Sequence, residues 1–579
     1  MVGATAQRAA VGLTALAAAS LGFERIDPSF GLTADLRLTN LRLVVVLGLA
    51  AWLVGCGVTH SWPRGPAQVA LPAALWLMIL VLSAVFAPVY ETQAIAFVRD
   101  LAFGMAFGWL VYAVASTPAR QILIARALAI SGVGVAVFGL AEAGGVGPAV
   151  AWLEGFRYQA SFAVGELPRI SSTLPHPNVA AMLLGLALPL QVAWLATSRA
   201  LWTRVMLGVG AAMELAALVL TVSRAGILVS AVVLTFMMLA GAWLHHSGLA
   251  WTSLVASLGL AALFGLSLIR EPTALLHLTT ESIQAWYSAD YSTPAEVAAH
   301  PGEVAVVPVR LTNTGDRTWS SGGVHPFALS YHLEDADGAS VTYDGPRTPL
   351  PLDLSPGKSV ELDARLVAPP APGTYIVDWD GVQEAVTWFS WAGTPLGRTR
   401  LMVTGQPAVA PSDVVITPPP SLVPPPPSRL MQWRIALRMA RNRPLLGVGP
   451  DNFRWVYGNF AGLTTWDTGG HANSLYFEWL ADTGLPGLFV YMWLAWRLLR
   501  VSFTGLRHPH AERSIDRLAL WRVGLAASLL AWFLHGLLDY FYEPLPTNLA
   551  FWLIAGLALA SQSAWQNARN LAPCALSTM

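Results

Sequence analysis

Three side chains have the chemistry to handle a phosphorylated group and a hydroxyl: Arg224, Arg429 and His471. A guanidinium group binds phosphate oxygens through two parallel hydrogen bonds and stays charged at physiological pH, so both arginines are candidate anion ligands. Histidine titrates near neutral pH, so His471 is a candidate base for a hydroxyl proton. The residue types indicate a site in which fixed cations could hold an anion and a histidine could accept a proton.

Each of these residues also has a purely structural interpretation. Arg224 lies in a short turn between apolar segments and could extend to the membrane interface, as long cationic side chains commonly do. Arg429 could pair with lipid phosphates, as in other basic amphipathic helices. His471 could be an interfacial histidine whose hydrogen bonds are satisfied locally. The spacing of the neighbouring residues bears on which interpretation holds.

Three motifs follow one another around Arg429 and His471. They read R-x-x-x-W at 429–433, P-L-L-G-V-G-P-x-N-F at 444–453, and H-x-N-x-L at 471–475 followed by G-x-x-G at 484–487. In this order and spacing they resemble the signature of the O-antigen ligase and polymerase superfamily, membrane glycosyltransferases that act on undecaprenyl-diphosphate-linked glycans. Arg224 matches a similar S/T-R-[AG] turn in that family.

The resemblance implies transfer of a glycan from undecaprenyl diphosphate to a hydroxyl of a glycan, lipid or protein acceptor. It implies that Arg224 and Arg429 hold the diphosphate and that His471 is the catalytic base, with no cofactor and no metal. His176 and Asn178 lie in a stretch similar to the family's N-P-N-x-x-A, from which His176 departs. The residues expected to support the site are His176, Asn178, Asn473, Glu478, His535 and Asp539.

The composition indicates an integral membrane protein. Hydrophobic residues make up 55% and charged residues 12%, against roughly 25% charged in soluble chains. The net charge of zero argues against a nucleic-acid partner. The two cysteines, Cys56 and Cys574, suggest neither a disulfide framework nor a cysteine metal site. The sequence has no P-loop, G-x-G-x-x-G or D-x-D motif, which argues against a cytoplasmic sugar-nucleotide transferase.

Apolar segments of about 20 residues predict roughly twelve membrane-spanning helices. Residues 1–23 could instead be a signal peptide, which would leave the orientation of the other spans unchanged. The expected spans are 7–23, 41–59, 67–88, 92–115, 121–142, 175–197, 202–221, 223–244, 249–269, 473–496, 516–538 and 546–564.

Arginines in the short loops predict the orientation of these spans. With alternating spans, Arg64, Arg120, Arg126 and the arginines of 497–522 fall on one side, which is therefore expected to be cytoplasmic. The motifs then lie on the opposite side. The prediction is a multi-pass protein of the bacterial inner membrane with an extracytoplasmic, or periplasmic, site.

The insert between the ninth and tenth spans differs in composition from the rest of the chain. From Val304 onward it shows about seven short alternating runs separated by Gly, Asp and Pro, a pattern typical of a β-sandwich. The stretch LTNTGDRTWSSGG resembles an immunoglobulin-like module. The expected domains are a transmembrane bundle (1–270), the sandwich (271–406), a Pro-rich linker (407–428), a catalytic loop with an amphipathic helix (429–472) and C-terminal transmembrane helices (473–579).

Other functions remain open from the residues. A polymerase of the same superfamily would share the donor and the arginines and differ only in its acceptor. A polysaccharide transporter or flippase would place charges near the membrane midplane, whereas the polar residues here gather at one face. A receptor that senses a ligand through the sandwich would not need the Arg/His set.

Overall fold

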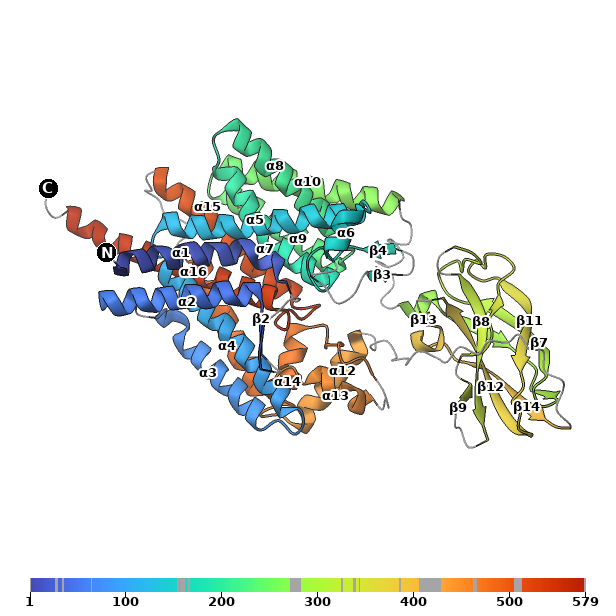
Figure 1. Ribbon diagram of the computed structural model, residues 1–579. Coiled ribbons are helices and arrows are strands. Elements are labelled where there is room, and N and C mark those ends of the chain that lie inside the picture. The colour runs from blue at the N-terminus through green and yellow to red at the C-terminus, as the bar shows by residue number, and fades with distance from the viewer. Residues whose placement is uncertain are drawn as a thin grey trace.

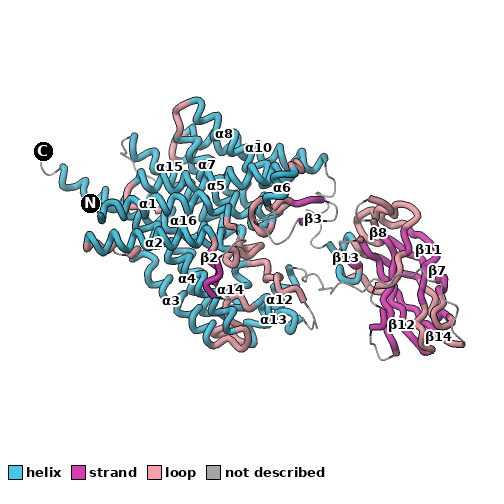
Figure 2. The backbone as a smooth tube through the Cα atoms, in the orientation of Figure 1, coloured by secondary structure: helices cyan, strands magenta, loops and turns pink. Residues whose placement is uncertain are grey.

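The computed structural model contains a helical region and a strand-rich region, which lie apart (Figures 1 and 2). The residues described are 2–25, 30–33, 36–63, 65–153, 156, 162–164, 167–270, 283–323, 326–336, 340–342, 344–384, 387–405, 429–461, 466–504 and 513–576. The Pro-rich stretch 407–428 lies outside them.

Ten helices within the described residues are long and apolar enough to cross a membrane. The expectation of twelve spans is therefore wrong by two. The segments at 7–23 and 473–496 are helical, but neither is apolar enough over a membrane-spanning length. The ten are α2 (Asn40–Thr59), α3 (Ala67–Val85), α4 (Glu91–Val114), α5 (Pro118–Ala143), α7 (Pro177–Thr197), α8 (Leu201–Leu220), α9 (Arg224–Trp243), α10 (Ser247–Arg270), and the parts Leu518–His535 and Leu545–Ala564 of α15 (Arg513–His535) and α16 (Leu545–Leu576).

Two helices form the centre of the bundle. The apolar window of α16 is 100% buried and that of α7 is 83% buried, because neighbouring helices surround both. Helix α10 is only 17% buried, so most of its apolar surface faces outward, where membrane lipid would cover it. The remaining helices are α1 (Val2–Ser20), α6 (Gly147–Leu153), α12 (Arg429–Asn442), α13 (Phe453–Ala461) and α14 (Leu475–Phe503).

Short strands cap one end of the bundle as two antiparallel hairpins. They are β1 (Phe30–Thr33) with β2 (Leu36–Leu38), and β3 (Phe162–Val164) with β4 (Leu167–Arg169). Helix α1 packs on α2 and α5, and its Ala10, Ala17 and Ala18 are fully buried in the bundle core.

The strand-rich region consists of two sheets. The larger has the order β10-β8-β12-β14-β6, with β9 paired to β8 and β13 to β12, and the smaller has the order β11-β7-β5. All neighbours are antiparallel except β14 and β6. The strands are β5 (Ala289–Ser292), β6 (Glu296–Ala299), β7 (Val304–Asn313), β8 (Phe327–Asp335), β9 (Ser340–Thr342), β10 (Thr348–Pro349), β11 (Ser359–Val367), β12 (Gly373–Gln383), β13 (Thr387–Trp388) and β14 (Gly397–Val403).

One apolar core lies between the two sheets. Every second residue along β7 and β11 is buried, so each strand turns one face to the core and the other to solvent. Val309 from β7, Leu329 from β8 and Val377 from β12 belong to the same buried cluster. This arrangement confirms the predicted strand-rich insert. The structure also contains two strands that the sequence pattern did not predict, β5 and β6, which precede the alternating runs that begin at Val304.

The tryptophans of this region mostly build the core. Trp319 is fully buried, and its indole Nε1 donates to the Trp286 carbonyl over 2.9 Å. The Asn313 side chain is also fully buried and donates to the carbonyls of Arg317 and Leu354, at 2.7 and 2.8 Å. The N-x-G-x-x-x-W stretch is thus a buried hydrogen-bonded turn that closes one end of the sandwich.

We expect a fragment of residues 283–405 to fold alone, because its core contains no residue of the helical region. A fragment that starts at residue 300 lacks β5, β6 and the buried Trp286, whose loss alone should cost about 3–5 kcal/mol. Circular dichroism melts of both fragments test this. The longer one should melt cooperatively at a higher temperature, and equal stability would exclude β5 and β6 from the folding unit.

Candidate functional site

Three arginines from distant parts of the chain converge at one end of the helical bundle. Arg169 ends β4, Arg224 begins α9 and Arg429 begins α12, and all three are half-buried. The charges of Arg224 and Arg429 act on each other and on Arg169. Burial and these two neighbours lower the pKa of Arg169 to about 10, while Asp539 opposes the shift. Arg169 therefore remains cationic at neutral pH, and repulsion by the two neighbouring arginines contributes to its lowered pKa.

Hydrogen bonds hold Arg169 in this cluster. Its Nε donates to the Thr221 carbonyl at 2.8 Å and its Nη2 to the Asn178 side-chain oxygen at 2.7 Å. The Asn178 amide in turn donates to the Asp539 carboxylate at 2.5 Å. Asp539 is the acidic group whose charge acts on both Arg169 and Arg429. The sequence analysis missed Arg169, since no motif marks it.

His471 forms a hydrogen-bonded pair with Glu478. Its Nδ1 lies 2.8 Å from Glu478 Oε1, and the other carboxylate oxygen accepts from the Ala472 amide at 2.6 Å. Glu478 projects from the first turn of α14 and is fully buried. The imidazole also lies against the Tyr540 ring, with centroids 4.8 Å apart. Tyr540 follows Asp539, so this pair and the arginine cluster share one loop.

The pair makes His471 strongly basic. Burial alone would lower the pKa of the imidazole, but the Glu478 carboxylate, helped by Asp451, raises it to about 9. At neutral pH most of the imidazole is therefore protonated. A carboxylate hydrogen-bonded to one imidazole nitrogen also fixes the ring's orientation and stabilises the imidazolium once it forms.

Asp451 and Arg454 complete this part of the site and were missed from the sequence. The Asp451 carboxylate is 3% exposed and accepts from Arg454 Nη2 at 2.6 Å, while Arg454 Nη1 lies 3.4 Å from Glu543. Burial raises the pKa of Asp451 to about 7, although Arg454 and His471 oppose it. A useful signal was the P-D-N triplet in the Gly-rich motif, which places a carboxylate directly after a turn.

Asp451, His471 and Glu478 each place one potential metal-ligating atom within 4.8 Å of the others. These residue types at this spacing could also hold a divalent cation. In this structure Glu478 accepts from His471 and Asp451 accepts from Arg454, so part of each group is already engaged. The expectation of a metal-independent reaction stays a prediction, which metal analysis of the purified protein would test.

Backbone pairing joins the Gly-rich motif at 444–453 to the segment of α14 just before the G-x-x-G motif at 484–487. Val448 N donates to the Ala481 carbonyl and Gly449 N to the Asp482 carbonyl, each over 3.0 Å. Asp482 then accepts from the amides of Asp451 and Phe453, at 2.7 and 3.0 Å. These bonds are possible because α14 breaks at Gly484, where φ is +69°, which frees carbonyls for the neighbouring loop.

The other predicted supporting residues take structural positions. His176 caps α7 by accepting from the Asn178 amide at 3.1 Å. Asn473 donates to Gln432 of α12 at 2.7 Å, which ties the catalytic loop to that helix. His535 is buried against Phe541, with ring centroids 4.7 Å apart. His535 and Asp539 lie four residues apart, but within the described part of the chain they form no hydrogen bond with each other.

Two glycines are required by this backbone pairing. Gly447 and Gly484 have φ of +65° and +69°, and a Cβ on either would overlap the facing backbone of Asp482 or Pro444. We expect Gly447→Ala and Gly484→Ala to destabilise the protein by about 1–3 kcal/mol or more. Thermal melting in detergent measures this. Gly57→Ala is the control, since an added Cβ there meets nothing within 4 Å; equal melting temperatures for all three variants would contradict the interpretation.

Comparison with known proteins supports the motif assignment. Residues 423–492 match the family model described as "O-Antigen ligase", which covers α12, α13 and the first part of α14. No curated protein matches the chain. Among solved structures, one match is Pseudomonas fluorescens alkylpurine DNA glycosylase AlkC bound to DNA containing an abasic site analog. The match covers 58% of this chain and 100% of the glycosylase chain, at 13% sequence identity and a TM-score of 0.14.

That TM-score is too low to carry a structural argument. The family match lies outside the strand-rich region, so the immunoglobulin-like resemblance of that region stays a prediction. Within the match lie Arg429, His471 and Glu478, together with the paired backbone that holds them. With ten candidate membrane helices around this segment, the chain is a polytopic helical membrane protein that carries an O-antigen ligase family domain.

Proposed function

We propose that the chain is a membrane glycosyltransferase of the O-antigen ligase and polymerase type. It transfers a glycan from undecaprenyl diphosphate to a hydroxyl of a glycan, lipid or protein acceptor. The family match supports the class, because this family transfers lipid-linked glycans. The observation that carries the proposal is the convergence of three arginines beside a His–Glu pair, all at one end of the bundle.

The arginine cluster suits a diphosphate leaving group. Three cations with one nearby carboxylate leave excess positive charge, which an anion with several oxygens would neutralise. As the anomeric C–O bond breaks, negative charge accumulates on the diphosphate, and fixed guanidinium groups stabilise that charge without reorganising. Arg224 and Arg429 therefore contact the diphosphate, and Arg169, held by Asn178, contributes a third charge.

His471 takes the proton of the acceptor hydroxyl as its oxygen attacks the anomeric carbon. The neutral imidazole is the reactive form, and the Glu478 carboxylate stabilises the imidazolium that results. Asp539 and Tyr540 link this base to the arginines, so the acceptor and the leaving group lie on the two sides of one sugar. Product release then requires the diphosphate to leave the arginines.

Removing the guanidinium fork should damage the reaction at each arginine. Arg169→Lys, Arg224→Lys and Arg429→Lys retain a charge but lose bidentate contact, and we expect transfer to fall by about 10²–10³. Arg441→Lys, on an exposed position of α12, is the matched control. Transfer rates and donor binding in detergent are measured together. Near-normal transfer rates in Arg224→Lys and Arg429→Lys would contradict the proposal that these two arginines hold the diphosphate.

The base should be separable from the donor site. His471→Ala should bind donor lipid normally, and its turnover should fall by a factor of about 10²–10⁴.

The rate should also depend on pH. Because the pKa of His471 is about 9, the wild-type rate should rise roughly tenfold per pH unit from 7 and level off near 9. Glu478→Gln removes the group that raises this pKa, so the rising limb should move to lower pH with a lower plateau. If the wild-type rate does not change between pH 7 and 9, a group other than His471 accepts the proton of the acceptor hydroxyl.

The product pattern tests the function as a whole. Purified protein given only a lipid-linked oligosaccharide should lengthen it if the acceptor is another lipid-linked glycan, as in a polymerase. A product that appears only with a second acceptor identifies a ligase. Sidedness follows from the same assay in vesicles: an impermeant acceptor should react only where the extracytoplasmic face is exposed. Transport of the glycan without any new glycosidic bond would favour a flippase instead.

A further inference from the structure

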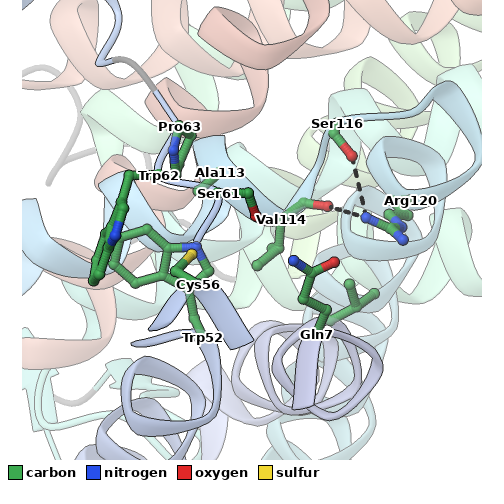
Figure 3. Close-up of a pocket in the computed structure, with 11 residues that line it drawn as sticks. Gln7, Trp52, Cys56, Ser61, Trp62, Pro63, Ala113, Val114, Ser116 and Arg120 are labelled. Atoms are coloured by element: carbon green, nitrogen blue, oxygen red, sulfur yellow. Dashed lines mark hydrogen bonds between the residues drawn. The ribbon is translucent and has the colours of Figure 1, made fainter. Parts of the chain in front are cut away.

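A cavity of about 270 Å³ lies between the helix ends of α1, α2, α4 and α5 (Figure 3). It is far from the arginine cluster. Arg120 lines it near the start of α5, whereas the other end of that helix contacts the arginine side, where Glu142 accepts from the Ser172 amide at 2.8 Å. Helix α5 has 26 residues, a length of roughly 39 Å. The cavity is therefore at the opposite membrane face.

One cation is held in place at the cavity wall. Arg120 Nη1 donates to the Val114 carbonyl at 3.3 Å and to the Ser116 hydroxyl at 3.1 Å, as Figure 3 shows. These bonds use a single nitrogen of the guanidinium group, which carries five N–H donors. Among the described residues that line the cavity, none has an acidic side chain. The Gln7 amide and the Ser61 hydroxyl add further donors on the neighbouring wall.

The remaining wall is aromatic and apolar. Trp52 and Trp62 meet edge to face, with centroids 6.2 Å apart, and Trp62 is 60% exposed. Tryptophan is enriched at the level of the lipid headgroups, where its ring contacts both chain and headgroup. A cation with hydroxyl and amide donors, next to interfacial tryptophans and between membrane helices, fits an anionic headgroup whose acyl chains continue along the bundle.

We propose that this cavity binds the phosphate of one anionic phospholipid from the membrane leaflet on that side. The phosphate oxygens accept from the Arg120 guanidinium and from Ser61, and the glycerol region packs on Trp52. Charge complementarity selects this occupant, because the described lining supplies a cation and no anion. The bound lipid joins four helix ends that the arginine site does not reach, so it stabilises the bundle rather than the transfer step.

Cys56 provides a built-in reporter. Its side chain belongs to the cavity lining, is 2% exposed and forms no disulfide. The only other cysteine in the sequence is Cys574, so Cys574→Ser leaves a single thiol. A lipid that fills the cavity should slow the reaction of this thiol with a small neutral reagent such as methyl methanethiosulfonate. A neutral reagent avoids any effect of the vesicle's surface charge on its local concentration.

The experiment compares Cys574→Ser protein in vesicles of phosphatidylcholine alone and of phosphatidylcholine with phosphatidylglycerol. We expect modification to be slower by about tenfold with phosphatidylglycerol, the factor that corresponds to one charge-assisted hydrogen bond. Arg120→Gln, made in the same background, should remove the difference. Arg126→Gln is the matched control, because its guanidinium lies over Trp194 and Trp521 instead, and protection should persist there.

Inorganic phosphate added to phosphatidylcholine vesicles separates a lipid from a free anion. Protection by inorganic phosphate alone would overturn the proposal in favour of a soluble ligand. Equal rates in both lipid mixtures, or equal protection in Arg120→Gln, would overturn it altogether. Native mass spectrometry gives an independent readout, since Arg120→Gln should retain one phosphatidylglycerol fewer than Arg126→Gln while both remain folded.

Discussion

The break in α14 at Gly484 is the constraint on which the site depends. In a continuous helix the Ala481 carbonyl would accept from the Leu485 amide, whereas here Leu485 N donates to Pro444 and the carbonyl accepts from Val448. The Asp482 carbonyl accepts from Gly449, because Pro486, four residues further on, has no N–H to offer it. The Ser83 hydroxyl of α3 donates to Asp482 and Leu446, which fastens the pairing to the bundle. The Gly-rich turn and the broken part of α14 thereby become one platform for the site.

That platform explains why a Gly-rich motif and a His motif occur together. Asp482 accepts from the start of α13, which places Asp451, and Glu478 lies one turn earlier on the same helix, facing His471. One short helical segment therefore orients both the acidic and the basic members of the site. A change in either glycine motif alters side chains that it does not contact directly.

Charge is divided unequally across the site. The arginine side gathers three cations around Asp539, whereas the His471 side gathers several buried carboxylates around one imidazole and Arg454. The first arrangement favours an anionic leaving group and the second favours a proton acceptor. The two functions come from different elements, with Asp539 and Tyr540 between them, so their mutants should fail in different ways. No residue that the structure describes in the strand-rich region belongs to either part.

Much of the architecture can be predicted from local patterns in the sequence. Hydrophobic runs of about 20 residues and period-two alternation determined the membrane helices and the strand-rich insert, because each depends on near neighbours in the chain. The motif spacing likewise marked Arg429 and His471. Hydrophobicity overcounted the spans by two, since α14 carries Gly484, Asp482 and polar neighbours, and α1 is rich in small residues.

Only the tertiary structure decided which polar residues meet. Arg169 joins the cluster because β4, α7 and the loop after α15 come together there, and no motif records that proximity. Asp451 becomes a site residue because a left-handed turn, with φ of +63°, buries its carboxylate beside Arg454. His535 and Asp539 are four apart yet do not pair, because the helix ends between them. The Asn178–Asp539 contact joins positions 361 residues apart, and the Asp451–Arg454 pair depends on how that turn is buried, so sequence spacing encodes neither.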